Sequence, residues 1–175
     1  HGVFRRQRQM CIRDRWGAHS SFNSSSNLYS INFPYEVDDI FKTYHDAVLL
    51  VDKGIKTVSS TSGHNLMNNH PFGEKRFQIA QENTDKLSTI LKNGDTNEFV
   101  MLVEDEALML HGLMMTSDPS YILIKSKTLK IIESIREFRS KNNIPVCFTL
   151  DAGANVHVLF PDKYSDIVYD LSLIH

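Results

Sequence analysis

The sequence predicts an α+β fold in which helices cover one face of a mainly antiparallel sheet. The chain has 175 residues, of which 41% are hydrophobic and 23% charged, as in an ordinary globular domain. Its predicted elements follow in the order strand, three helices, strand, strand. The last two strands flank a tight glycine-containing turn, and strands joined in this way most economically pair antiparallel.

The first predicted elements are a loop and a strand. Residues 17–35 are rich in Ser and Asn and show no helical period, so we expect a loop or crossover there. The aliphatic run Ala47–Val51 lies between Asp46 and Asp52, and a short run of this kind is typical of a buried central strand.

Three helices are predicted next. The first covers residues 74–91 and ends at Asn93-Gly94, the usual place of a left-handed cap. Asp95 and Glu98 have the spacing of a capping box, so a second helix with an apolar stripe is expected to follow. We expect Ser126 to cap a third helix, whose inward residues are Leu129, Ile132, Ile135 and Phe138.

The last two predicted strands, residues 145–150 and 155–160, are joined by the turn Asp151-Ala-Gly-Ala154. On pattern alone Asp151 is a turn residue, because Asp, Gly and Asn are favoured in turns. The functional interpretation is a carboxylate on a rigid element, placed to accept a proton.

The two ends of the chain have an unusual composition. Residues 1–15 hold five arginines and one acid, which by itself is typical of a nucleic-acid-binding arm or a transit peptide. However, residues 9–15 and 171–175 back-translate as opposite strands of one DNA sequence, which is similar to the transposase end used in sequencing adapters. We therefore expect residues 1–15 and 171–175 to be translated adapter, flanking a piece of a longer protein.

Without those ends, residues 16–170 carry 14 basic and 20 acidic residues, a net charge of −6, which argues against nucleic-acid binding. No apolar stretch approaches the roughly 20 residues that a membrane-spanning helix needs. The two cysteines are too few for a disulfide framework and fit a reducing compartment, so we expect a cytoplasmic protein.

Two further clusters in the sequence have residue types that occur in binding sites. The hydroxyls and glycine of Ser59–Gly63 are suited to holding a phosphate, although the full pattern of a nucleotide-binding loop is absent. His64 and His70 lack the spacing of a metal site, and no metal ligand is predicted. We expect His111 to be packed or partnered within the fold rather than catalytic.

Taken in order, three segments resemble the C-terminal half of diphosphomevalonate decarboxylases, over residues 16 to about 160. They are Lys56-Thr-Val-Ser-Ser-Thr-Ser-Gly63, the Glu106–Gly112 helix with the Ser117–Tyr121 loop, and Phe148-Thr-Leu-Asp-Ala-Gly-Ala-Asn-Val-His157. The joint presence of the Val-Ser-Ser-Thr and Thr-Leu-Asp-Ala-Gly segments is more specific than either alone.

The resemblance implies a two-domain fold of the GHMP kinase superfamily. Residues 16–45 would be the end of the N-terminal domain and a crossover, and residues 46–170 an incomplete C-terminal domain. It also implies Mg2+- and ATP-dependent conversion of mevalonate diphosphate to isopentenyl diphosphate in isoprenoid synthesis, with nucleotide and metal bound mainly by the missing half. A homodimer is a further implication, and the piece itself is expected to be inactive.

For individual residues, the resemblance implies that Asp151 is the catalytic aspartate, near the tertiary hydroxyl of the substrate. Ser59 and Ser60 would lie on the phosphate side, and Asn155 would hold the backbone or orient the carboxylate. The sequence has Ala154 where proline is common in the family, which removes a fixed φ from the turn. Two alternatives stay open: a related mevalonate or phosphomevalonate kinase or decarboxylase, and a non-catalytic α+β binding module.

Overall fold

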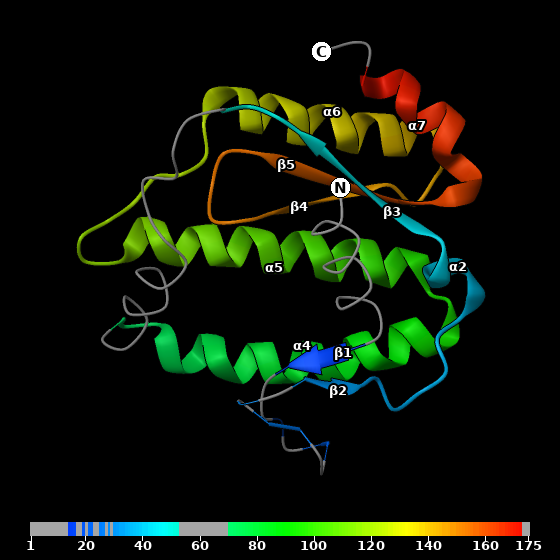
Figure 1. The fold of residues 1–175 in the computed structure, drawn as a ribbon. Helices are drawn as coiled ribbons and strands as arrows, with labels where there is room; N and C mark the ends of the chain where they lie inside the picture. The colour runs from blue at the N-terminus through cyan, green and yellow to red at the C-terminus, as the bar shows by residue number, and fades with distance from the viewer. Residues whose placement is uncertain are drawn as a thin grey trace.

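The computed structural model describes residues 14–16, 19, 21–22, 25–26, 28, 30–52 and 70–172. Its elements are β1 (Asp14–Trp16), β2 (Ser30–Asn32), α2 (Asp39–Lys42), β3 (Tyr44–Leu49), α4 (Gly73–Asn93), α5 (Thr96–Thr116), α6 (Ser126–Asn142), β4 (Cys147–Leu150), β5 (Val156–Pro161), a 3-10 turn (Asp162–Tyr164) and α7 (Ser165–Ser172). Figure 1 shows the three long helices α4, α5 and α6 beside a small sheet, which confirms the predicted α+β class.

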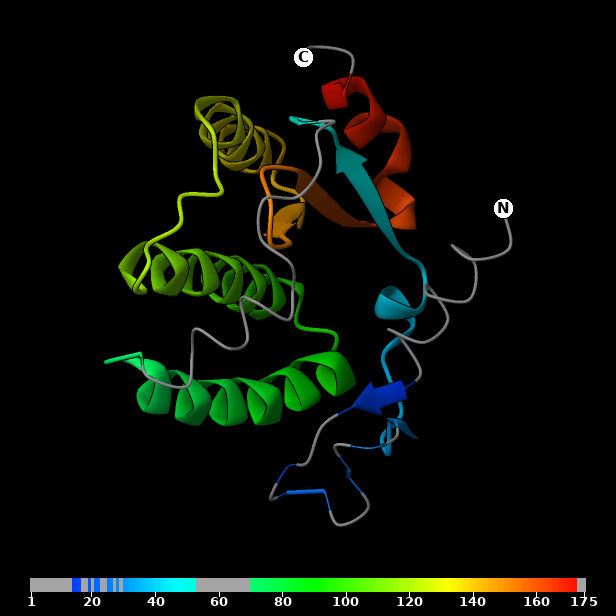
Figure 2. The ribbon, with the colours of Figure 1, turned by 60° about the vertical axis from the view of Figure 1, so that its left-hand side comes forward.

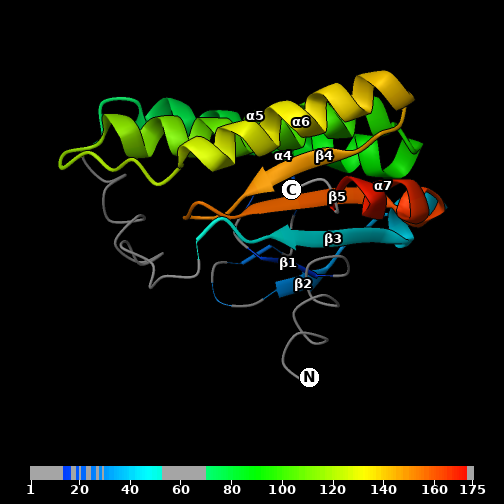
Figure 3. The same ribbon diagram turned by 90° about the horizontal axis from the view of Figure 1, so that it is seen from above.

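The sheet has the order β3-β5-β4, and both pairs are antiparallel. The pairing of β4 with β5 confirms the predicted antiparallel pair. The run Ala47–Val51 does contribute to a strand, β3, but the prediction that this strand is buried and central is wrong, since β5 is the central strand of the described sheet and β3 lies at its edge (Figure 3). Val48 is 47% exposed because only one face of β3 packs on the core, and Leu50, directly after the strand, is 57% exposed.

The core lies between α6, α7 and one face of the sheet, with α5 along β4 and α4 packed on α5 (Figure 2). Alternation in β5 turns Val156, Val158 and Phe160 inward, where they meet Ile131, Ile132 and Ile135 of α6. Phe148, Phe160 and Ile135 are fully buried. This packing gives the turn between β4 and β5 a rigid base.

The junction of α4 and α5 follows the predicted capping signals in part. Gly94 ends α4 in the left-handed region, with φ of 72°, and its amide donates to the Ile90 carbonyl. The Asp95 side chain caps α5 by accepting from the Glu98 amide at 3.0 Å, as predicted. The expected reach of Glu98 back to the Asp95 amide does not occur, because that amide donates to Ile90 instead.

The start of α6 differs from the prediction. Ser126 is its first helical residue rather than its cap, and the capping position belongs to Lys125. The Lys125 amide donates to the Thr128 hydroxyl at 3.1 Å, so a side chain inside the first turn satisfies the group that precedes the helix.

A buried carboxylate ties α5 to α6. Glu104 is 4% exposed and accepts from Arg136 at 3.1 Å and from Arg139 at 2.5 Å. Arg139 also donates to the Val146 carbonyl at 2.8 Å, just before β4. Two helices and the approach to β4 are therefore joined at one ionic cluster.

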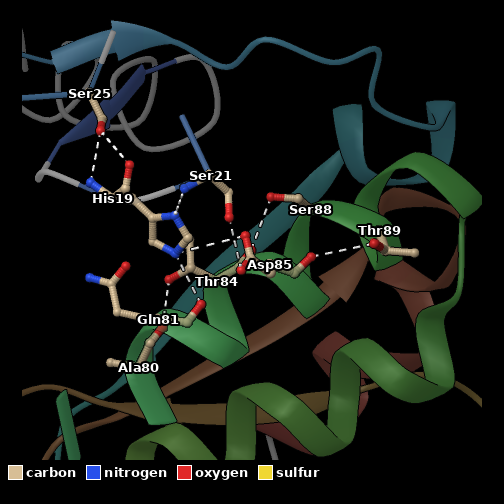
Figure 4. Close-up of polar contacts among 9 residues, drawn as sticks. All are labelled: His19, Ser21, Ser25, Ala80, Gln81, Thr84, Asp85, Ser88 and Thr89. Atoms are coloured by element: carbon tan, nitrogen blue, oxygen red, sulfur yellow. Dashed lines mark hydrogen bonds and ion pairs between the residues drawn. The ribbon is translucent and has the colours of Figure 1, made fainter. Parts of the chain in front are cut away.

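The N-terminal part of the described chain rests on α4. β1 and β2 form a two-stranded antiparallel pair, so residues 30–32 are a strand within the segment predicted as a loop. Figure 4 shows buried His19 against α4, with its Nε2 3.0 Å from the Gln81 carbonyl, and Ser21 donating to Asp85 at 3.2 Å.

The domain boundaries inferred from the sequence stay predictions.

Within the described ranges, no helix combines the length and the apolarity that crossing a membrane would require.

Candidate active site

Asp151 lies directly after β4, at the first position of the turn that leads into β5, and is half-buried. Its main-chain oxygen accepts from the Gly153 amide at 2.7 Å, which closes the turn around Ala152. A Cβ atom added to Gly153 would lie 3.0 Å from Oδ1 of Asp151. The carboxylate therefore leans over the turn, and glycine leaves room for it.

His111 of α5 lies against the same turn. Its side chain is 2% exposed, and its Nε2 is 3.0 Å from the main-chain oxygen of Asp151. Burial lowers the pKa of His111, although the Asp151 carbonyl and charge act in the opposite direction. The prediction that His111 is packed or partnered is confirmed, and the partner is the peptide of the candidate catalytic residue.

Asn155 and Thr128 hold the other end of the turn. Oδ1 of Asn155 accepts from the main-chain amides of Val51 and Asp52, at 2.9 and 3.0 Å. The Thr128 hydroxyl donates to the Ala154 carbonyl at 2.7 Å. The turn is therefore held by the segment just after β3, by the first turn of α6 and, through His111, by α5.

The rim of this region carries an ion pair between Lys125 and Asp52. Asp52 is also the last described residue before the segment that contains Ser59 and Ser60. Those two serines and His64 lie outside the described residues, so the predicted phosphate-side role of the Ser-rich segment stays a prediction.

Two further histidines, His70 and His157, have partners elsewhere in the fold. Nε2 of His70 lies 3.1 Å from the Leu113 carbonyl, at the end of α5. His157 pairs with Asp46 across β5 and β3, at 2.9 Å, on the face of the sheet opposite the core. In the described ranges, no three His, Cys, Asp or Glu side chains gather as metal ligands.

The sequence singled out Asp151 and Asn155, which lie at the two ends of one turn, but two contacts of that turn were not predicted. The Thr128–Ala154 contact joins residues 26 apart, beyond the reach of a local sequence pattern. The His111–Asp151 contact joins residues 40 apart, and no local pattern specifies it.

Comparison with known proteins shows which domain family the chain resembles. The family described as the mevalonate 5-diphosphate decarboxylase C-terminal domain matches residues 47–173. A phosphomevalonate decarboxylase of Haloferax volcanii is 25% identical over 99 residues, which cover 57% of this chain and 30% of that protein.

Solved structures agree in fold. A mevalonate diphosphate decarboxylase from Legionella pneumophila superposes with a TM-score of 0.70 at 26% identity, over 80% of this chain and 43% of that one. The mevalonate diphosphate decarboxylase from Enterococcus faecalis is described for a mevalonate-diphosphate-mediated ATP binding mechanism. It superposes with a TM-score of 0.76 at 20% identity, over 94% of this chain and 49% of that one. The chain thus spans less than half the length of these proteins.

Proposed function

Because the chain belongs to the family of mevalonate 5-diphosphate decarboxylase C-terminal domains, we propose that the complete protein carries out the ATP-dependent decarboxylation of mevalonate 5-diphosphate. The products are isopentenyl diphosphate, ADP, phosphate and carbon dioxide, and the reaction serves isoprenoid synthesis. The observation that carries this proposal is the Asp151 carboxylate on a turn held from three sides.

Asp151 is the catalytic residue in this proposal. Its carboxylate accepts the proton of the substrate's tertiary hydroxyl while that oxygen takes up the phosphoryl group of ATP. The new phosphate then leaves with its bonding electrons, and the bond to the carboxylate carbon breaks to give carbon dioxide and the carbon–carbon double bond. Such a base must lie within roughly 3 Å of the proton that it accepts, so a rigid turn suits the task.

Ser59, Ser60 and Asn155 complete the proposed site. We assign the two serines to the phosphate side of the substrate, and Asn155 to the same site through its hold on the turn. We propose that the complete protein binds ATP and Mg2+ mainly through the part that this chain does not span; the description of the Enterococcus enzyme supports ATP. We further propose a cytoplasmic homodimer without nucleic-acid or membrane partners.

The test is Asp151→Asn in the full-length protein, expressed from its complete gene. Turnover should fall by about a thousandfold, while ATP binding and the unfolding midpoint stay near the parent values. Asp162→Asn is the matched control, because that carboxylate is exposed and pairs with His45. Parent-like turnover in Asp151→Asn would remove the residue from the mechanism.

A second candidate is decarboxylation of mevalonate 5-phosphate, which the Haloferax relative favours. Assaying carbon dioxide and ADP release with the monophosphate and with the diphosphate separates the two. ADP without carbon dioxide would instead indicate a kinase, and neither product with either substrate would favour a binding module.

A further inference from the structure

The contact between His111 and Asp151 defines the state of the imidazole. A main-chain oxygen only accepts hydrogen bonds, so Nε2 of His111 carries the proton that points to Asp151. Nδ1 is buried and has no hydrogen-bond partner among the described residues. Protonation of Nδ1 would bury a second donor without an acceptor, so the geometry selects the neutral ring with Nε2–H.

The Asp151 carbonyl receives two donors from different directions. One is the Gly153 amide at 2.7 Å, within the turn, and the other is His111 at 3.0 Å, from the buried side of α5. Two bonds to one oxygen fix the plane of the peptide that follows Asp151. That plane sets the direction in which the side chain of Asp151 leaves the main chain.

We propose that His111 is a positioning residue for the Asp151 carboxylate: its neutral Nε2–H anchors the peptide from which the carboxylate projects. This inference rests on the proposed function of Asp151. His111 is 2% exposed, so it acts on the carboxylate through the turn.

A neutral donor has a chemical advantage over a cation at this place. A lysine or arginine beside Asp151 would stabilise the negative charge of the carboxylate and weaken it as a base. The buried, uncharged imidazole holds the main chain without that effect. Its ring is also rigid, so little rotamer freedom is lost when the bond forms.

The test compares His111→Leu with His111→Gln in the full-length protein. Leucine removes the donor and keeps apolar bulk, whereas the glutamine amide can present an N–H near the position of Nε2. We expect kcat to fall by roughly tenfold or more in His111→Leu, with KM for ATP and substrate within about threefold of the parent. His111→Gln should recover most of that loss.

His70 supplies the matched control. It too is a buried imidazole whose Nε2 faces a main-chain oxygen, but that oxygen belongs to Leu113 of α5 and not to the turn. We expect His70→Leu to lower the melting temperature as His111→Leu does and to keep kcat within about twofold of the parent. Equal losses of kcat in the two leucine variants would overturn the proposal.

Hydrogen–deuterium exchange gives a reading that does not depend on activity. Exchange of the Gly153 amide should be roughly tenfold faster in His111→Leu than in the parent and should slow again in His111→Gln, while α4 stays unchanged. Unchanged exchange at Gly153 would overturn the proposal even if the leucine variant lost activity. If exchange responds as expected but Asp151→Asn keeps parent turnover, His111 still orders the turn and it is the proposed function that fails.

Discussion

The side-chain oxygen of Asn155 accepts a hydrogen bond from the Val51 amide at 2.9 Å, which joins the segment just after β3 to the turn that begins at Asp151. The same oxygen accepts from Asp52 at 3.0 Å. One amide side chain thus connects segments 103 and 104 residues apart in the sequence.

Asn155→Ala should lower the free energy of unfolding by about 1–2 kcal/mol, because two main-chain amides lose their acceptor. Asn155→Asp keeps an accepting oxygen and should lose less. Urea unfolding of the three proteins measures the difference, and an alanine variant as stable as the parent would contradict the role of this side chain.

Gly153→Ala should disturb the carboxylate rather than the fold. The new Cβ would lie 3.0 Å from Oδ1 of Asp151, so the carboxylate must move by a few tenths of an ångström. We expect turnover of the full-length protein to fall by roughly tenfold. Gly112→Ala is the matched control, since a Cβ there meets nothing within 4 Å; it should raise helix stability by up to about 1 kcal/mol and leave turnover unchanged.

The lowered pKa of His111 predicts a pH dependence of stability. Above pH 6.5, the ordinary histidine value, the ring is neutral in both the folded and unfolded states, and its contribution is fully present. As the pH falls below 6.5, the unfolded chain takes up a proton that the buried ring resists, so stability is lost with a slope of at most about 1.4 kcal/mol per pH unit. The loss between pH 7.5 and pH 5.5 should be smaller in His111→Gln; the same loss in both proteins would contradict burial of a neutral ring.

Glu104→Gln should be more destabilising than Glu106→Gln. Glu104 is 6% exposed in its side chain and pairs with two arginines, whereas Glu106 is 33% exposed and pairs with Arg76. Removing the buried charge leaves Arg139 without its ionic partner, which should lower the free energy of unfolding by about 2–3 kcal/mol. Removing the charge of the more exposed pair should lower it by about 1 kcal/mol. Thermal unfolding of the two variants ranks them, and the reverse order would refute the assigned burial.

Cys147 should be unreactive in the folded protein. Its side chain is fully buried, and burial raises the pKa of its thiol to about 12, so almost no thiolate exists at pH 8. Alkylation followed by peptide mass mapping should label Cys147 only after denaturant is added. Rapid labelling under native conditions would show that β4 opens.

Sequence patterns predicted the elements best where the signal was local. Gly94 and Asp95 marked the α4–α5 junction correctly, because left-handed caps and side-chain N-caps depend on neighbouring residues. The place of β3 within the sheet was predicted wrongly, because an aliphatic run is equally suited to a central strand and to an edge strand with one exposed face.

In the candidate site, too, the residues with a local signal were predictable and the contacts between distant residues were not. Asp151 could be singled out because its turn and the family resemblance are both contained in a few consecutive residues. The contacts that hold it come from α5, α6 and the end of β3, and such contacts depend on tertiary packing that no short motif encodes.

The pairing of β3 with β5 has a consequence for biosynthesis. His157 and the residue it bonds, Asp46, are separated by 111 positions, so a growing polypeptide emerges with β3 long before its neighbour has been translated. Closing so long a loop is slow compared with forming helices, and α4, α5 and α6 will acquire their hydrogen bonds first. On the ribosome, we therefore expect the turn that carries Asp151 to be among the last parts of the domain to take its final shape, because one of the two strands that flank it, β5, is translated after the helices.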